Sequence, residues 1–533
     1  MKNYMFKHFK SDLFGGVTAA IIALPLALAF GVASGLGASA GLLGAIIVGF
    51  FAALLGGTPS QVSGPTGPMT VVVASLVALY SNDLNIVFWA IFLAGIFQIA
   101  AGYLKFGNLI KYVPYPVISG FMSGIGIIII LLQINPLLGE KSLGSTLDVI
   151  TSFVNTLNNI SLNDTIIGVL ALLTVFLTPK SINKKFPAPL IALVVCTVLA
   201  YFFIPEVKTI GEIQGIVPHI KIGLINLSEL VKIIPMAGTL CILGCVDSLL
   251  TSLVADSVTG YKHDSKKELI GQGIGNSIAG IFGGLAGAGA TMRTVINIKA
   301  GGTTRLSGII HSLFLVLIAF ALSPLVAKIP LAVLAGILVK VGFDIIDYKL
   351  LKLAFVAPKR DLIVAITVLL ITVLNDLIFA VGVGIVLSAI LFAVSVADKT
   401  KVSVKPLDNN DFDIIPDKLK QKIILVELEG ALFFGTTPKI IETIENLLDT
   451  RIIILNCSSS PDFDISAVFA IRDLASRLHE QGAAVYLVLS NKKNINKFNN
   501  LIPEDLISKK EIFTSISKAV EQATLKLSES ENS

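Results

Sequence analysis

Long apolar stretches follow one another through most of this chain of 533 residues, and they constrain its fold more than any other feature. A helix needs about 17–25 mostly apolar residues to cross a bilayer. Only 14% of the residues are charged, whereas soluble domains have about 25%. The chain is therefore predicted to be a polytopic α-helical membrane protein. Fourteen apolar segments are expected, at 14–34, 41–56, 66–80, 84–104, 116–136, 165–178, 187–204, 231–254, 270–284, 290–299, 306–327, 331–347, 361–375 and 377–397.

The basic residues of the predicted loops indicate the orientation in the membrane. Lys2, Lys7 and Lys10 precede the first segment, and the positive-inside rule places such residues in the cytoplasm. An even number of crossings returns the chain to the same side, where Lys399 and Lys401 follow the last segment. We therefore expect cytoplasmic N- and C-termini in a plasma (inner) membrane protein. The net charge of +5 reflects these loops, and no nucleic-acid partner is inferred from it.

The segments divide into two sets of seven, with repeats at about 14–204 and 231–397. Because seven is odd, the second set must insert with the opposite orientation, which predicts an inverted repeat. The third segment of each set, at 66–80 and 290–299, is too short to cross the membrane and follows a stretch rich in glycine or proline. These two segments are predicted half-helices. Paired interruptions at matching positions indicate a transporter binding site.

Two related sequences open the half-helices, GPTGPMT at 64–70 and GAGATMR at 287–293. A helix N-terminus presents unpaired N–H groups and the positive end of the helix dipole, so two of them aimed at one point would favour an anion. The candidate substrate-binding residues are Thr66 and Thr70 in the first opening and Met292 and Arg293 in the second.

Asp247 lies in the eighth apolar segment, with apolar or small residues for at least one turn on each side. A carboxylate inside the bilayer costs about 2.5–3.5 kcal/mol on insertion scales, so it usually faces a cavity and serves a function. Thr251 follows on the same helix face, and the glycine-rich backbone around Gly289 offers carbonyl oxygens. Together they predict a small-cation site. Arg293 either attracts the substrate anion or pairs with Asp247, and both interpretations stay open.

The composition changes after Lys399. Strand and helix patterns alternate there, which predicts a small α/β domain. In chain order these patterns lie at 423–429, 438–448, 451–455, 466–480 and 484–489. The predicted boundaries are 1–398 for a transmembrane domain, 399–420 for a linker, 421–526 for the α/β domain and 527–533 for a disordered tail rich in serine and glutamate.

Several of these sequences resemble the SulP anion permeases. The likeness is carried by DLFGGVTAA, ALPLALAFG, GPTGPMT, VDSLLTSLVAD and GAGATMRTVINI. The C-terminal unit resembles a STAS domain, and within the family the chain is similar to the sodium-dependent bicarbonate transporters of cyanobacteria. This resemblance implies core and gate domains with elevator-type alternating access, and a homodimer held partly by cytoplasmic STAS domains. It also implies Thr66, Ala290 and Thr291 as substrate contacts, and Asp247 and Thr251 as sodium ligands.

The expected function is secondary active uptake of bicarbonate coupled to sodium. Uptake of sulfate or a dicarboxylate with protons, through Asp247, is the nearest alternative. A nucleobase permease could share the architecture, but Arg293 favours an anion. A membrane-anchored regulator acting through its STAS domain would leave the paired half-helices unexplained. Neither an enzyme nor a bound cofactor is predicted, because no nucleophile–base pair or metal-ligand spacing occurs among the five histidines and four cysteines.

Overall fold

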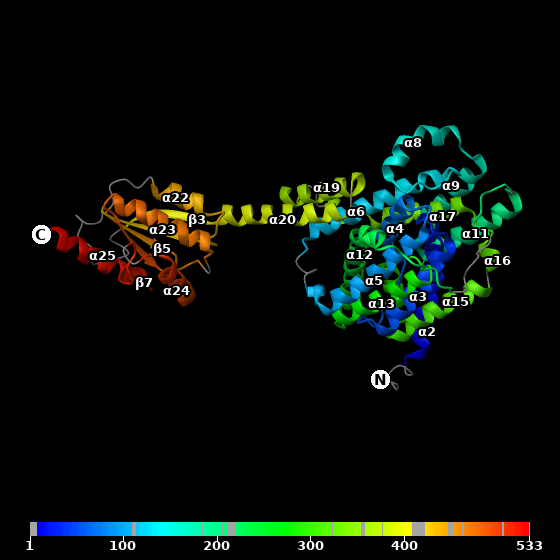
Figure 1. Cartoon of the computed structure of the whole chain (residues 1–533), viewed down its shortest axis with the longest axis horizontal. Helices are drawn as coiled ribbons and strands as arrows, with labels where there is room; N and C mark the ends of the chain where they lie inside the picture. Colours follow the sequence, from blue (N-terminus) through cyan, green and yellow to red (C-terminus); the bar gives the residue numbers. More distant parts are fainter. Residues whose placement is uncertain are drawn as a thin grey trace. The chain divides into compact units, whose positions relative to one another are not determined.

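The computed structural model describes most of the chain and shows two compact units, Met1–Val386 and Leu387–Ser533. The first unit is almost entirely helical and the second is α/β (Figure 1). The described residues are 8–108, 113–183, 186–204, 206–211, 219–321, 323–352, 356, 358–375, 377–407, 422–445, 451–460, 463–503 and 506–531.

A helix forms within each of the predicted apolar segments. In chain order these helices are α2 (Phe9–Ala33), α3 (Ala38–Leu55), α4 (Gly67–Leu79), α5 (Leu84–Tyr103), α6 (Tyr115–Leu132), α9 (Leu162–Leu177), α11 (Ala188–Phe203), α12 (Leu227–Thr259), α13 (Ser265–Ile281), α14 (Thr291–Lys299), α15 (Arg305–Ala321), α17 (Leu331–Ile345), α19 (Lys359–Leu374) and α20 (Leu377–Lys399). By length and composition, six helical stretches among the described residues are suited to cross a membrane. As predicted, α4 and α14 are short, with 13 and 9 residues.

The two halves of the first unit interchange their packing partners. Helix α15 lies against α2 and α3, and its counterpart α5 lies against α12 and α13. In the same way α17 packs on α9, and α19 packs on α6. A twofold relation between two halves produces this exchange, which agrees with the predicted inverted repeat. Each half therefore buries its apolar surface largely against the other half.

Two short strands join the openings of the half-helices, and sequence patterns did not predict them. Strand β1 (Ser63–Gly64), which precedes α4, pairs antiparallel with β2 (Ala288–Gly289), which precedes α14. A Cβ atom on Gly287 would lie 2.5 Å from the carbonyl carbon of Gly64, so the close approach of the two chains requires glycine at this position. The pairing holds the N-termini of α4 and α14 in one place.

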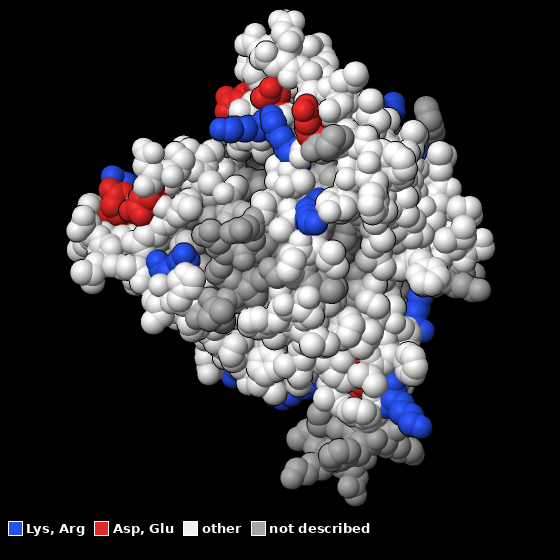
Figure 2. Space-filling view, turned by 90° about the vertical axis from the view of Figure 1, so that its right-hand side faces the viewer, with Lys and Arg blue, Asp and Glu red and all other residues white. Residues whose placement is uncertain are grey.

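One face of the helical unit is largely uncharged. Figure 2 shows a face on which uncharged side chains predominate and charged ones gather in a few small groups. Large apolar side chains are exposed on many helices, including Phe203 at 76% and Leu177 at 72%. Exposed apolar surface of this extent is typical of contact with lipid.

The second unit contains a five-stranded sheet in the order β3-β4-β5-β6-β7. Strands β4 to β7 are parallel, and β3 is an antiparallel edge strand. The three predicted strands correspond to β4, β5 and β6, which confirms the α/β domain. The strands are β3 (Lys401–Pro406), β4 (Ile423–Glu429), β5 (Ile452–Asn456), β6 (Ala484–Val488) and β7 (Ile512–Phe513), and the helices are α22 (Thr437–Glu445), α23 (Ile465–Glu480), α24 (Lys492–Leu501) and α25 (Ile516–Glu531).

Two of the predicted boundaries in this region are wrong. Residues 401–406 of the predicted linker form β3, which pairs with β4 along its whole length, while 408–420 lie outside the described residues. The predicted disordered tail is helical up to Glu531, because α25 continues and buries Leu527 against the sheet. Only 532–533 of that tail lie outside the described residues. The two valines of β3 and the single leucine of 527–533 were too few to signal either element.

We expect a fragment from 399 to 531 to fold alone, because its core lies between its own strands and helices. Cys457 is the fragment's single cysteine, and burial raises the pKa of its thiol to about 12. The fragment should show an α/β circular dichroism spectrum, and the thiol should react with a disulfide reagent only after urea is added. A matched fragment starting at 421 lacks β3 and should unfold at lower urea. A random-coil spectrum or a fast reaction in buffer would contradict the domain assignment.

Candidate substrate and cation site

The openings of the two half-helices meet through Arg293. This buried side chain is in the first turn of α14, and its Nη2 donates to the carbonyl oxygen of Pro65, 2.6 Å away, just before α4. Thr66 follows as the N-cap of α4. Its side chain is buried, and its hydroxyl has no hydrogen-bond partner. Because the first amides of a helix have no partner within it, both helices present N–H groups near this point.

Asp247 and Arg293 are neighbours without forming an ion pair. Asp247 Oδ2 and Arg293 Nη1 are both buried and have no hydrogen-bond partner. Both Arg293 and Thr66 nevertheless lie close enough to influence the Asp247 carboxylate. Of the two interpretations of Arg293, the structure disfavours direct pairing with Asp247. A positive and a negative group, each with a free atom, therefore face the same buried region.

Thr251 and Gly289 lie together one helical turn from Asp247. The Thr251 hydroxyl donates to the carbonyl oxygen of Gly289 at 3.0 Å and shares a 2.8 Å hydrogen bond with the hydroxyl of Thr291. Ser248 accepts a hydrogen bond from the Gly289 amide at 3.0 Å. These contacts attach the opening of α14 to α12. The predicted cation ligands and the predicted substrate contact Thr291 are thus brought into one place.

Three of the predicted substrate-binding residues contribute less to the site than expected. The Thr70 hydroxyl donates to the carbonyl oxygen of Thr66 at 2.8 Å, so it is engaged within its own helix. The Ala290 amide donates to the carbonyl of Val62 at 2.9 Å and is not free for an anion. Met292 is 63% exposed. Its neighbours Thr291 and Arg293 are half-buried and buried, so Met292 is the most exposed residue of the α14 opening.

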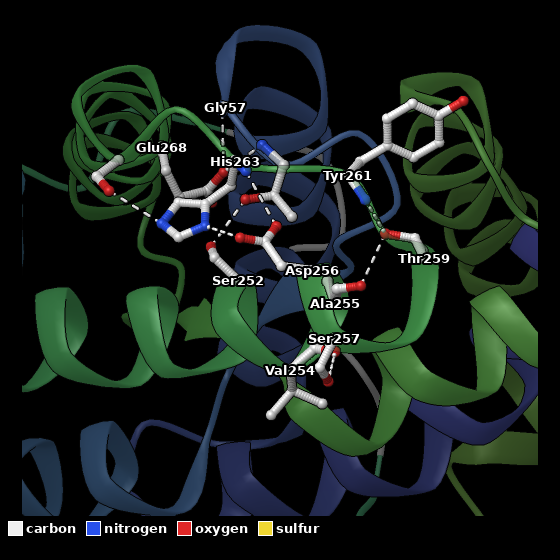
Figure 3. Close-up of polar contacts among 12 residues, drawn as sticks. Gly57, Ser252, Val254, Ala255, Asp256, Ser257, Thr259, Tyr261, His263 and Glu268 are labelled. Carbon is white, nitrogen blue, oxygen red and sulfur yellow. Dashed lines mark hydrogen bonds and ion pairs between the residues drawn. The ribbon is translucent and has the colours of Figure 1, made fainter.

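A buried carboxylate behind the site was not singled out from the sequence. Glu268, in the first turn of α13, is only 1% exposed. Its Oε2 accepts hydrogen bonds from the amides of Gly57 and Thr58, both at 2.9 Å. Its Oε1 accepts from the side-chain amides of Gln61 at 2.8 Å and Gln272 at 2.9 Å. Four donors therefore surround this one carboxylate, and Figure 3 shows the contact with Gly57.

The Glu268 network connects the loop before β1 to α12 and α13. Ser252 of α12 donates to Gln61 Oε1 at 3.0 Å, and Gln272 donates to the hydroxyl of Ser63 in β1 at 2.5 Å. A Cβ atom on Gly289 would lie 2.3 Å from Gln61 Nε2, so the same glutamine packs directly against β2. The network thus supports the segments that lead into α4 and α14. No signal in the sequence indicates it, because glutamate is common in the first turn of any helix.

A second group of polar contacts, separate from the Glu268 network, holds the loop between α12 and α13. Asp256 Oδ2 is 2.6 Å from His263 Nδ1, and His263 Nε2 is 2.9 Å from the Ser265 hydroxyl. The His263 amide also donates to Asp256 Oδ1 at 3.0 Å. Figure 3 shows His263 directed at Asp256. Asp256 therefore holds the loop at the end of α12 and is separate from the Asp247 site.

Comparison with known proteins agrees with this architecture. Residues 9–368 match the Sulfate permease family, and residues 415–519 match the STAS domain. The chain is 41% identical to the bicarbonate transporter BicA of Synechocystis sp., over 99% of this chain and 97% of that protein.

Solved structures show the same likeness. The transmembrane domain of a cyanobacterial bicarbonate transporter BicA is 48% identical, with a TM-score of 0.68 over 71% of this chain and 98% of that one. The murine anion transporter Slc26a9 shares the fold at 20% identity, with a TM-score of 0.82 over 97% of this chain and 92% of that one. The family consists of membrane transporters of anions, so the chain is a transporter rather than an enzyme. It is an integral membrane protein that belongs to the sulfate permease family and carries a C-terminal STAS domain.

Proposed function

We propose that this protein takes up bicarbonate together with sodium, by elevator-type alternating access. The similarity to bicarbonate transporters over nearly the whole chain supports this substrate. The observation that carries the proposal is the pair of unpartnered atoms, Asp247 Oδ2 and Arg293 Nη1. Since the two charges do not neutralise each other directly, each has an atom available for a ligand of opposite charge.

The anion would bind between the openings of α4 and α14. Arg293 Nη1 and the Thr66 hydroxyl are two unpartnered side-chain donors there, and the helix N-termini add backbone N–H groups. Bicarbonate is small and planar, and its oxygens suit the planar fork of a guanidinium group. Thr291, the first residue of α14, shares a hydrogen bond with Thr251, one of the proposed cation ligands.

The cation would bind to oxygen atoms on the other side of the same region. The ligands proposed are Asp247 Oδ2, the Thr251 hydroxyl and the Gly289 carbonyl oxygen, the last two of which are 3.0 Å apart. Hard cations prefer such oxygen ligands. With both ligands bound, sodium balances Asp247 and bicarbonate balances Arg293. A balanced site crosses a low-dielectric environment at lower cost than one with a net charge.

The remaining features of the proposal concern orientation and assembly. The basic residues of the loops support cytoplasmic termini and a cytoplasmic STAS domain in the plasma (inner) membrane. The likeness to the family supports a homodimer held partly by its STAS domains. Sodium is then a transported partner of bicarbonate, and no resident cofactor is proposed.

Isotope uptake into proteoliposomes tests the function. Labelled bicarbonate, sulfate and fumarate are offered to the purified protein at fixed pH, with either sodium or choline outside. We expect bicarbonate uptake that requires sodium. Equal bicarbonate uptake in sodium and choline would remove sodium coupling. Uptake of sulfate or fumarate driven by an imposed pH gradient would instead establish the proton-coupled alternative.

Thr66→Val should weaken bicarbonate transport, whereas Thr70→Val should change it little. Both variants remove one hydroxyl from α4, but that of Thr66 is unpartnered and that of Thr70 is bonded to its own helix. A hydrogen bond contributes about 0.5–1.5 kcal/mol, so the apparent affinity in Thr66→Val should fall about two- to tenfold. The measurement is the concentration dependence of initial uptake rates. Equal kinetics in the two variants would remove Thr66 from the site.

A further inference from the structure

Helix α8 (Thr146–Asn158) connects α7 (Ile134–Leu137) to α9 and carries an exposed apolar stripe. Leu147, Ile150, Val154 and Leu157 recur at helical spacing and expose 49%, 51%, 67% and 45% of their surface. Residues three and four apart lie on one helix face. The helix was not expected from the sequence, because it is too short and too polar to cross a membrane.

The neighbouring face of α8 is fixed against membrane helices. Val149 and Thr156 are buried, and α8 packs on α6, α7 and α19. Near its start, the Thr146 hydroxyl donates to the carbonyl oxygen of Val373 at 2.9 Å, one residue before α19 ends. Near its end, the Thr156 hydroxyl contacts Asn135 of α7 at 3.4 Å. The helix is therefore fastened at both ends to the termini of predicted membrane spans.

The chemistry of α8 suits a membrane surface. Asp148 is the single charged residue from 142 to 163. Asp148 and Asn155 lie about 120–140° around the helix from the middle of the stripe, and Thr151 lies between them and Leu147. The Thr151 and Ser152 hydroxyls donate to carbonyl oxygens of their own helix at 2.9 and 2.5 Å. Hydroxyls satisfied in this way need no water and are compatible with a low-dielectric environment.

We propose that α8 lies in the interfacial layer of the bilayer, with its apolar stripe against the lipid acyl chains. The next helix, α9, also exposes apolar residues, such as Leu162 at 70% and Ile166 at 49%. Figure 1 shows α8 beside α9 at the margin of the helical unit. An amphipathic helix of this kind binds a membrane in proportion to the apolar area it buries. The proposal is independent of the substrate, and it makes α8 an anchor that keeps the ends of α7 and α19 at one depth.

A single tryptophan reports which environment the stripe contacts. The chain contains one tryptophan, Trp89, so Trp89→Phe provides a background without tryptophan fluorescence. Ile150→Trp places the probe on the stripe, and Asn155→Trp places the matched control on the polar face. Each variant is reconstituted in vesicles of phosphatidylcholine with or without brominated acyl chains. We expect bromolipid to quench most of the Ile150→Trp fluorescence and aqueous iodide to quench mainly Asn155→Trp.

Two other outcomes would overturn the proposal. Strong iodide quenching of both probes means that the stripe faces water. Protection of Ile150→Trp from both quenchers means that protein, such as a second copy of the chain, covers the stripe. Recovery of each variant in the vesicle membranes in the same amount as the Trp89→Phe background, and its resistance to extraction by alkaline carbonate, show that it has inserted correctly. Val154→Trp lies on the same stripe and replaces Ile150→Trp if the latter does not insert.

Discussion

Replacing Asp247 by asparagine should abolish the stimulation of bicarbonate uptake at sodium concentrations that are sufficient for the wild type. The amide keeps the shape of the side chain but removes the charge that the proposed cation would balance. Interactions with charged groups contribute about 1.5–3 kcal/mol, so sodium affinity should fall roughly 10- to 100-fold. Sodium titrations of the initial uptake rate measure this loss. Asp247→Glu keeps the charge at a different distance and should retain part of the stimulation.

Asp256→Asn is the matched control for this experiment. Asp256 is a second carboxylate of α12, but it pairs with His263 outside the site. Its replacement should leave the half-maximal sodium concentration unchanged. The proposed role of Asp247 fails if Asp247→Asn responds to sodium as the wild type does, or if both asparagine variants lose the response equally.

Glu268→Ala should destabilise the folded transporter more than any substitution of an exposed residue. It would leave four donors without their acceptor, namely the half-buried amide of Gly57, the buried amide of Thr58 and the buried side chains of Gln61 and Gln272. Each buried group left unsatisfied costs about 1–3 kcal/mol, so we expect a loss of at least about 3 kcal/mol. The measurement is the fraction of monodisperse protein that survives heating in detergent, together with the amount inserted in membranes.

Two variants separate this effect from a general weakening of α13. Glu268→Gln keeps one carbonyl oxygen but places an NH₂ group against two of the donors, so its stability should be intermediate. Asp264→Ala removes the exposed N-cap of the same helix, which accepts from the Lys267 amide at 3.1 Å. Loss of a cap costs about 0.5–2 kcal/mol. If Glu268→Ala is no less stable than Asp264→Ala, the network does not hold the site together.

The half-helices could be predicted because their signal is local. Glycines and prolines crowd at 64–68 and 283–289, and each group precedes a short apolar run. Asp247 could be recognised because apolar or small residues flank this carboxylate for at least one helical turn on each side. Met292 could not be placed in this way, because its exposure depends on the packing of α14 against α12. Likewise, the sequence alone does not show that the Thr70 hydroxyl donates to the carbonyl oxygen of Thr66 in its own helix.

The β1–β2 pairing and the Glu268 network depend on contacts between residues far apart in the chain. Strands of two residues have no periodicity that a pattern could reveal. Gly57 and Glu268 are separated by 211 positions, and nothing around either residue indicates the other. Local patterns thus located the elements of the site, whereas the structure was needed to show how they are supported.

The same separation has a consequence for biosynthesis. A ribosome adds about 5–20 residues per second. Glu268, which accepts hydrogen bonds from the amides of Gly57 and Thr58, lies up to 211 residues later in the chain and is therefore made roughly 10–40 s after them. Before Glu268 is made, the first seven spans enter the membrane with polar loop groups that lack their final partner. Because the two halves also exchange packing partners, the first half cannot complete its fold early. The nascent transporter therefore depends on the insertion machinery to shield an unfinished half-protein until its complement has been translated.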